Sequence, residues 1–143
     1  MKNAREKLRT AQKYALSNQP LVGGFPFLAE CLREAGVQRN TWSLPSLQSI
    51  YVMEKDVIVL QETPLKIMTE SVPSFEKTLL IAAIRADQTG KSTFPEFLEA
   101  LWKSGIVQYE VDFFAHTVTY HGARRETYQE SYPKVSVPII DFT

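Results

Sequence analysis

The stretch TFPEFLEALWKSGIVQYEVDFF, residues 93–114, decides the fold, because its pattern changes from that of a helix to that of a strand. Thr93 and Glu96 have the spacing of a capping box, and Pro95 falls in the first turn, where its missing N–H is harmless. Apolar residues recur at helical spacing at Phe94, Phe97, Leu98 and Leu101. Gly105 supplies the left-handed residue that ends a helix. The first half of the stretch therefore predicts a short helix with one buried face.

Beyond Gly105 the period changes to an alternation of apolar and polar residues. One side carries Val107, Tyr109, Val111 and Phe113, and the other carries Gln108, Glu110 and Asp112. A turn at Ala115-His116 leads into residues 117–122, which alternate in the same way. The pattern predicts a β-hairpin with one face in the core and one face in water.

A similar stretch, FPFLAECLREAG, occupies residues 25–36, 69 positions earlier. At this spacing, Gln19–Pro64 and Gln88–Pro133 share 8 identities, where average composition gives about three. Each copy is preceded by an amphipathic helix and followed by a third extended piece. The expected buried residues of these helices are Ala4, Leu8, Ala11 and Ala15 in the first, within 4–17, and Phe75, Leu79, Ala82 and Ala86 in the second, within 74–86.

We therefore predict an α+β fold of two tandem α-α-β-β-β units, related by a pseudo-two-fold, in which helices cover an antiparallel sheet. The units span about 1–66 and 70–135, a short tail follows at 136–143, and the whole chain forms a single domain built from an internal duplication.

The composition excludes several classes of function. The 143 residues include 16 Lys and Arg against 16 Asp and Glu, so no bulk charge attracts nucleic acid or an anionic membrane. A single cysteine excludes an internal disulfide and the multi-cysteine zinc sites. No stretch is typical of a signal peptide or a membrane span, so we expect a cytoplasmic protein with neither a nucleic-acid nor a membrane partner.

Four motifs resemble a family of small bacterial proteins, a domain of unknown function whose members are often labelled phage envelope protein. They are Gly90-Lys91-Ser92, Phe94-Pro95-Glu96-Phe97, Lys103-Ser104-Gly105-Ile106 and Thr117-Val118-Thr119-Tyr120. The first unit is similar to the family around Gly24-Phe25-Pro26 and Ala35-Gly36-Val37, and it departs at 54–59, which lacks a glycine. The resemblance implies the fold and a phage-related label, and it brings no catalytic residues.

The wet face of the second hairpin carries the candidate catalytic residues Glu110, Asp112 and His121, with Thr117 and Thr119 beside them. A histidine near two carboxylates can act as a general base or bind a metal. The alternative, which we favour, is an exposed face of ordinary polar pairs.

The expected buried face of the strand at 107–113 has its equivalent in the first unit, where the matching positions carry Gln38, Asn40, Trp42 and Leu44. Gln38 and Asn40 could anchor a ligand in a pocket that Trp42, Tyr51 and Met53 line. The alternative, which we favour, is that this strand lies at the edge of the sheet and is partly open to water.

Three other features receive structural interpretations. Gly90-Lys91-Ser92 lacks the preceding strand and glycine of a phosphate loop. The basic stripe Arg5, Arg9 and Lys13 fits a solvated helix face better than a nucleic-acid site. Cys31 fits a packing role better than that of a nucleophile.

Two hypotheses for function follow. The first, which we favour, is a non-enzymatic binding or regulatory module for a small molecule, peptide or protein partner, with a homodimer as one form it could take. The second is a metal-dependent or hydrolase-like enzyme that uses Glu110, Asp112 and His121. No cofactor and no resident metal are expected under the first hypothesis.

Overall fold

The computed structural model describes residues 3–65, 68 and 70–143. Within this part of the chain the elements are, in order, α1 (Ala4–Asn18), α2 (Gly24–Glu34), β1 (Val37–Ser43), β2 (Gln48–Met53), β3 (Val57–Gln61), α3 (Lys77–Gln88), α4 (Phe94–Lys103), β4 (Ile106–Asp112), β5 (Thr117–Gly122) and β6 (Thr127–Ser131).

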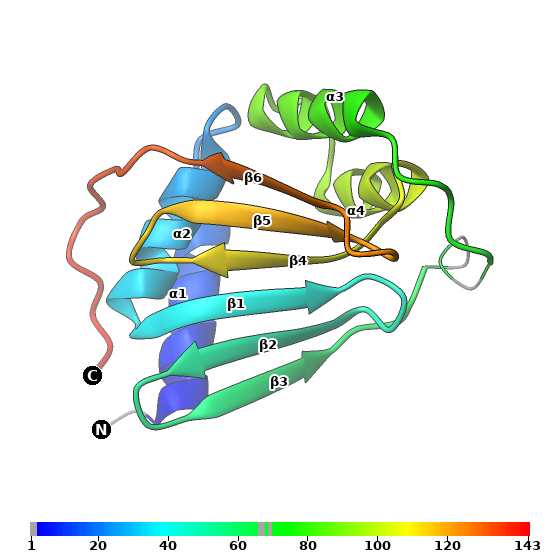
Figure 1. The fold of residues 1–143 in the computed structure, drawn as a ribbon. Coiled ribbons are helices and arrows are strands. Elements are labelled where there is room, and N and C mark those ends of the chain that lie inside the picture. Colours follow the sequence, from blue (N-terminus) through cyan, green and yellow to red (C-terminus); the bar gives the residue numbers. More distant parts are fainter. Residues whose placement is uncertain (1–2, 66–67, 69) are drawn as a thin grey trace.

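The six strands form one antiparallel sheet in the order β3-β2-β1-β4-β5-β6. The helices cover one face of this sheet and leave the other face open (Figure 1). The predicted α+β class and helix-covered antiparallel sheet are confirmed, and the order α-α-β-β-β occurs twice along the chain. An internal duplication stays a prediction, and the expected end of the first unit near residue 66 lies outside the described residues.

The two halves of the sheet meet where β1 pairs with β4. In this register Thr41 lies opposite Glu110, and Trp42 lies opposite Tyr109. Thr41 and Glu110 are 69 residues apart, so the register is the one that a two-fold between the predicted units requires. Our expectation that the strand beginning near Gln38 lies at the sheet edge was therefore wrong. The polar Asn40 is tolerated at the centre because its amide donates to the Ile50 carbonyl at 3.1 Å.

Most helices begin, and bury the face, where the sequence predicts. The capping box is present: the Thr93 hydroxyl accepts from the Glu96 backbone N–H, and the Glu96 carboxylate accepts from the Thr93 N–H. The predicted face of α3 was wrong, because this helix begins at Lys77 and buries Leu80, Ala83 and Ile84. Leu79 is 46% exposed. The run of apolar residues offers two helical stripes, and packing of α3 in the folded chain, where its main neighbour is α4, buries the other one.

β4 departs from the simple alternation of buried and exposed residues that the sequence predicts. The register with β5 shifts between Ile106 and Gln108, as at a β-bulge. Ile106 is fully buried, whereas Val107 is only partly buried. The extra residue places Ile106 on the inner face, where we expected Val107.

The core lies between the helices and the inner face of the sheet. Its largest fully buried side chains include Trp102, Phe113, Leu8, Leu44 and Leu80. In the part of the chain that the structure describes, none of the helices combines the length and apolar character needed to cross a membrane.

The segment before α3 crosses closely over Gly105, which has a φ of 88°. A Cβ atom at this position would lie 2.6 Å from the Phe75 Cα and 2.7 Å from the Ser74 carbonyl oxygen. Both neighbours are backbone atoms and cannot rotate away. Gly23 also has a left-handed conformation, with a φ of 73°, but no atom lies within 4 Å of an added Cβ.

We predict that Gly105→Ala lowers the free energy of unfolding by about 2–5 kcal/mol, since backbone strain and overpacking add. Gly23→Ala serves as the matched control and should cost only about 1 kcal/mol, from the left-handed backbone alone. Urea unfolding of the two variants measures both values. Equal losses would contradict the close packing at Gly105.

An ion pair fixes α3 to the edge strand β6. Arg85 donates two hydrogen bonds to the Glu130 carboxylate, at 2.8 and 2.7 Å, and the Tyr128 hydroxyl donates a third. The Arg85 guanidinium, together with Tyr128, holds the pKa of Glu130 below its ordinary value of 4.5. A lowered carboxyl pKa means that the pair stabilises the fold above pH 4.5 and loses this effect as the pH falls below that value.

We predict that Glu130→Gln lowers the free energy of unfolding at neutral pH by about 1 kcal/mol, a small value because half-exposed Arg85 is screened by water. The difference from the wild type should shrink below pH 4.5, where the wild-type carboxyl becomes protonated. Urea unfolding over a pH series measures this. Glu99→Gln, at the exposed pair with Lys103, is the control and should change stability by only about 0.3 kcal/mol. A difference at Glu130 that persists unchanged in acid would contradict the ionic contribution.

Candidate functional site

The candidate catalytic residues on the outer face of the sheet are spread along the β4–β5 pair. Glu110 lies opposite Thr119, Asp112 opposite Thr117, and His121 opposite Gln108. Asp112 and His121 therefore lie near opposite ends of the pair, roughly 13 Å apart along the strand at 3.3 Å per residue. Among the described residues, no group of three His, Cys, Asp or Glu side chains could hold a metal ion.

Each carboxylate of this group also has a structural contact. Glu110 lies 3.9 Å from the Arg39 guanidinium across the β1–β4 pair. Asp112 accepts hydrogen bonds from the backbone N–H groups of Phe114 and Ala115, both at 3.0 Å, and so stabilises the β4–β5 turn. The alternation in the sequence assigns these residues to one face of the strand pair. The register then separates Asp112 from His121 along that pair.

The four candidate ligand-binding residues do not line one cavity, and Gln38 falls at a register shift of β1. Gln38 borders a depression at one end of β1, and Trp42 borders a smaller cavity at the other end. Asn40 and Tyr51 lie between them in the core. Gln12 of α1 donates to the Tyr51 hydroxyl at 3.4 Å. Tyr51 and Asn40 are thus packing residues here, and Trp42 is the member of the set with access to an apolar cavity.

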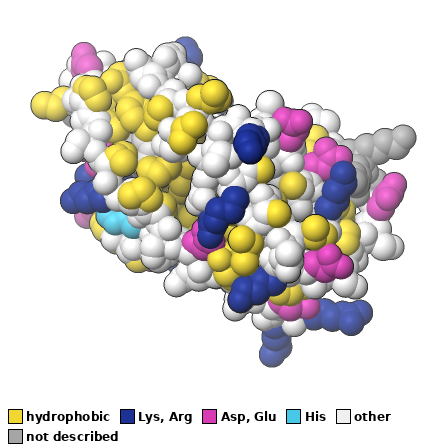
Figure 2. Space-filling view, turned by 90° about the horizontal axis from the view of Figure 1, so that it is seen from above, with side chains coloured by type: hydrophobic (Ala, Val, Ile, Leu, Met, Phe, Trp, Pro, Cys, Tyr) yellow, Lys and Arg dark blue, Asp and Glu magenta, His cyan; other side chains and the backbone are white. Residues whose placement is uncertain are grey.

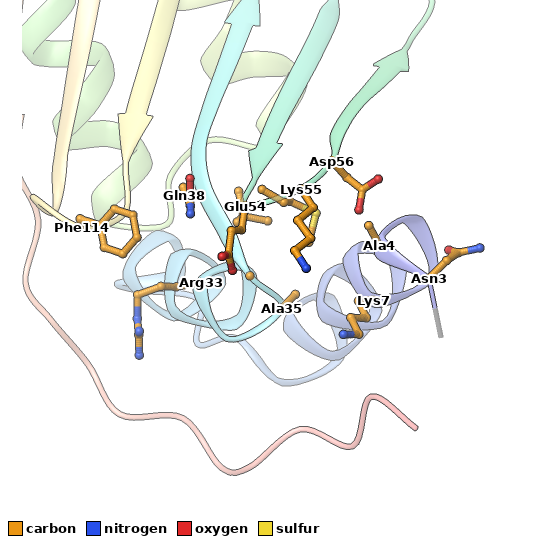
Figure 3. A pocket seen from close by; sticks show the side chains of 13 residues that line it. Asn3, Ala4, Lys7, Arg33, Ala35, Gln38, Glu54, Lys55, Asp56 and Phe114 are labelled. Atoms are coloured by element: carbon orange, nitrogen blue, oxygen red, sulfur yellow. The ribbon is translucent and has the colours of Figure 1, made fainter. Parts of the chain in front are cut away.

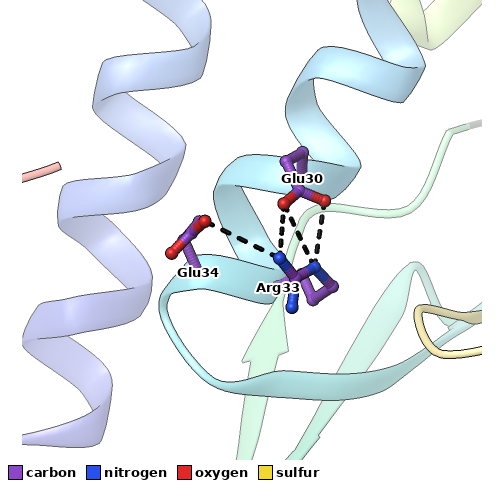
Figure 4. A network of polar contacts seen from close by, with 3 residues as sticks. All are labelled: Glu30, Arg33 and Glu34. Carbon is purple, nitrogen blue, oxygen red and sulfur yellow. Dashed lines mark hydrogen bonds and ion pairs between the residues drawn. The ribbon is translucent and has the colours of Figure 1, made fainter. Parts of the chain in front are cut away.

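The larger depression has a volume of about 690 Å³ and lies between α1, α2 and the β2–β3 turn (Figure 3). Charges of both signs surround it, including Lys7, Glu54 and Lys55. Arg33, at its rim, is held by Glu30 at 2.6 Å and Glu34 at 3.6 Å (Figure 4). Because the lining carries both charges, and Arg33 already has acidic partners, the larger depression indicates no particular class of ligand.

The smaller cavity has a volume of about 350 Å³ and a mostly apolar lining. It lies between the β1–β2 turn, the start of α4 and the segment after β3. The described residues that line it are Trp42, Leu47, Glu62, Thr63, Leu65, Phe94, Pro95 and Leu98. Trp42 packs edge to face against Phe94 with ring centroids 5.2 Å apart, and Phe94 remains 46% exposed. An apolar cavity with aromatic walls and few polar groups is the usual form of a small-molecule site.

The corresponding corner of the other half of the molecule is filled by an aromatic side chain. Leu47 and His116 occupy equivalent turns, with φ values of 49° and 55°. The Leu47 carbonyl accepts from the Glu62 N–H at 3.0 Å, and the His116 carbonyl accepts from the Tyr132 N–H at 2.9 Å. Glu62 and Tyr132 therefore take equivalent positions after β3 and β6. Tyr132 packs on both Phe25 and His116, with ring centroids 5.2 and 5.3 Å apart.

This comparison explains why one corner is open. Phe94 of the cavity and Phe25 of the filled corner begin the two matched helical stretches. Where Phe25 meets the ring of Tyr132, Phe94 and Trp42 border a space lined by Glu62 and Thr63. Sequence reasoning missed Glu62, Thr63, Phe94 and Leu98 as site residues. The sequence contained one signal for this site. Just before the matched prolines, the second unit has the aromatic Tyr132, whereas the first unit has the polar Glu62 and Thr63.

The aromatic row behind the cavity has a packing role. Trp42, Tyr109, Tyr120 and Tyr128 follow one another across four neighbouring strands, with consecutive centroids 6.4, 5.9 and 6.4 Å apart. Burial raises the pKa of Tyr109 and of Tyr120 well above the ordinary value. Both hydroxyls therefore stay protonated near neutral pH, and the row forms a rigid base beneath Trp42.

The remaining sequence candidates lie apart from the cavity. Cys31 is buried, and burial together with Glu30 and Glu34 raises the pKa of its thiol to about 11, so it remains a thiol.

Hydrophobic side chains also gather on the face seen from above (Figure 2). Leu16, Leu21 and Val22 are exposed at the end of α1 and in the loop after it.

Two comparisons place the chain among known proteins. Uncharacterized protein Rv2012 of Mycobacterium tuberculosis and uncharacterized protein Mb2035 of Mycobacterium bovis are each 45% identical to it over 128 residues. These matches cover 90% of this chain and 78% of each relative. The phage label stays a prediction. Residues 16–130 match the family described as "Protein of unknown function (DUF1398)", and the chain therefore belongs to this family.

Proposed function

We propose that the protein is a binding module for a small molecule, and that the ligand occupies the cavity beside Trp42. The observation that carries this proposal is the difference between the two equivalent corners of the fold. Tyr132 fills one corner, whereas Glu62 and Thr63 border a cavity of about 350 Å³ at the other. A space of this size falls within the range of ligand sites, at its lower end.

The walls of the cavity are held in place before any ligand arrives. Trp42 is fixed from one side by Phe94 and from another by Tyr109, with centroids 5.2 and 6.4 Å apart. Leu98 is almost fully buried in α4, whose start is fixed by the capping box of Thr93 and Glu96. A preformed site loses little conformational entropy on binding, which favours affinity.

The enzyme alternative has less support. It requires Glu110, Asp112 and His121 to act together, and the β4–β5 register puts Asp112 and His121 near opposite ends of the strand pair. The cavity itself brings one carboxylate, Glu62, and one hydroxyl, Thr63, to its wall. These groups suit recognition of a ligand, and a binding role requires no further reactive group.

The first prediction concerns stability without ligand. Glu62→Tyr should fill the cavity in the way that Tyr132 fills the equivalent corner, and should raise the free energy of unfolding by about 1 kcal/mol. The reciprocal variant Tyr132→Glu should lower it by about 3 kcal/mol, because two ring contacts are lost and a corner opens. Urea unfolding measures both. Destabilisation by Glu62→Tyr would show that the two corners are not equivalent.

The second prediction concerns binding. In a thermal-unfolding screen of metabolites, a ligand at 100 times its dissociation constant should add about 2.7 kcal/mol, or roughly 5–10 °C in melting temperature for a chain of this size. The effect should disappear in Glu62→Tyr, which closes the cavity.

Val59→Tyr is the matched control for this screen, because it adds the same ring on the exposed face of β3, where Val59 is 44% exposed. This control should keep the stabilisation by ligand. A compound that stabilises the wild type and Glu62→Tyr equally binds elsewhere and argues against this site, and a screen without any stabilising compound would count against the binding role.

A further inference from the structure

We infer that the cavity beside Trp42 selects a small organic cation, an amine or a quaternary ammonium compound with a compact apolar body. This inference rests on the proposed function and adds the chemical class of the ligand. It follows from the charge of the lining, the orientation of the aromatic rings and the occupied donors at the start of α4.

Among the described residues that line the cavity, one side chain is ionisable. Glu62 carries a charge, and the other seven described residues are apolar except for Thr63. Within residues 3–65, 68 and 70–143, the Glu62 carboxylate makes no hydrogen bond and no ion pair, whereas Glu30, Glu110 and Glu130 are each paired with an arginine. A carboxylate beside an apolar cavity and without a cationic partner is electrostatically complementary to a cationic ligand.

The aromatic walls favour the same charge. Trp42 and Phe94 both line the cavity, and their rings pack edge to face at an interplanar angle of 65°. The face of an aromatic ring carries negative electrostatic potential, and tryptophan attracts cations more strongly than the other aromatic side chains do. Two rings at an angle with a carboxylate nearby form the type of cage that binds ammonium groups.

The start of α4 is the feature that could have favoured an anion, since helix N-termini present free N–H groups. Here those donors are largely used. The Glu96 N–H donates to the Thr93 hydroxyl at 3.3 Å, and the Thr93 N–H donates to the Glu96 carboxylate at 2.9 Å. Pro95 has no N–H, and the capping hydrogen bonds lower the pKa of Glu96, which keeps a negative charge at this helix end. An anion would therefore meet two carboxylates and few donors.

The test uses choline and its uncharged isostere 3,3-dimethylbutan-1-ol, titrated into the full chain at constant ionic strength. Binding is followed in ¹H–¹⁵N spectra by the indole N–H of Trp42 and the backbone N–H of Phe94. We expect choline to shift both signals and to bind at least tenfold more tightly than the alcohol, a difference of about 1.4 kcal/mol.

Glu62→Gln keeps the size of the side chain and removes its charge, so the affinity for choline should fall about tenfold while that for the alcohol stays unchanged. Glu54→Gln, at the larger depression, is the matched control and should leave both affinities unchanged. A response to Glu54→Gln in place of Glu62→Gln would assign choline to the depression and overturn the inference.

The inference and the proposed function fail in different ways. If the alcohol binds as tightly as choline and Glu62→Gln has no effect, selection of cations is overturned, while a small-molecule site beside Trp42 stands. If neither probe shifts the signals of Trp42 and Phe94, the cation class is overturned, and the metabolite screen with Glu62→Tyr decides separately whether the cavity binds another ligand.

Discussion

The pairing of β1 with β4 is the contact on which the rest of the structure depends. It joins two three-stranded sheets into one sheet with a continuous core. Three-stranded sheets of this size would expose two more edges, and exposed edges invite unspecific pairing. The pairing is antiparallel and places Thr41 opposite Glu110 on the outer face, so Trp42 and Tyr109 meet on the inner face beneath the helices.

This central position sets the chemistry of β1. A strand with neighbours on both sides and helices on one face has no water with which to satisfy an inward-pointing amide, so Asn40 must find a partner inside the sheet and donates to Ile50. Trp42, two residues on, ends an aromatic row that continues through Tyr109, Tyr120 and Tyr128. The indole is therefore supported from within the core, and its free side borders the cavity.

Local signals in the sequence predicted the secondary structure well, and long-range packing accounts for the failures. The capping box at Thr93 and the stop at Gly105 depend on neighbouring residues and were visible in the sequence. The buried face of α3 was not, since Leu79 and Leu80 belong to alternative stripes and only tertiary packing, chiefly against α4, distinguishes them. The position of β1 in the sheet and the bulge at Ile106 depend on partner strands far along the chain. The cavity was missed because one extra residue in the β5–β6 turn aligns Tyr132 with Thr63, instead of Glu62, in a gapless comparison.

The open corner has a cost that the filled corner lacks. An aromatic side chain at Glu62 would bury about half of its roughly 200 Å² against Trp42 and Phe94, which contributes about 2 kcal/mol. The entropy lost on fixing the ring reduces this to a net gain of about 1 kcal/mol. The fold accommodates such a ring, since Tyr132 occupies the equivalent place on the same backbone hydrogen bond. A carboxylate next to two rings forgoes this stabilisation. Positions that give up stability in this way are typical of functional sites, and a ligand that brings its own apolar body and positive charge would restore what the side chain omits.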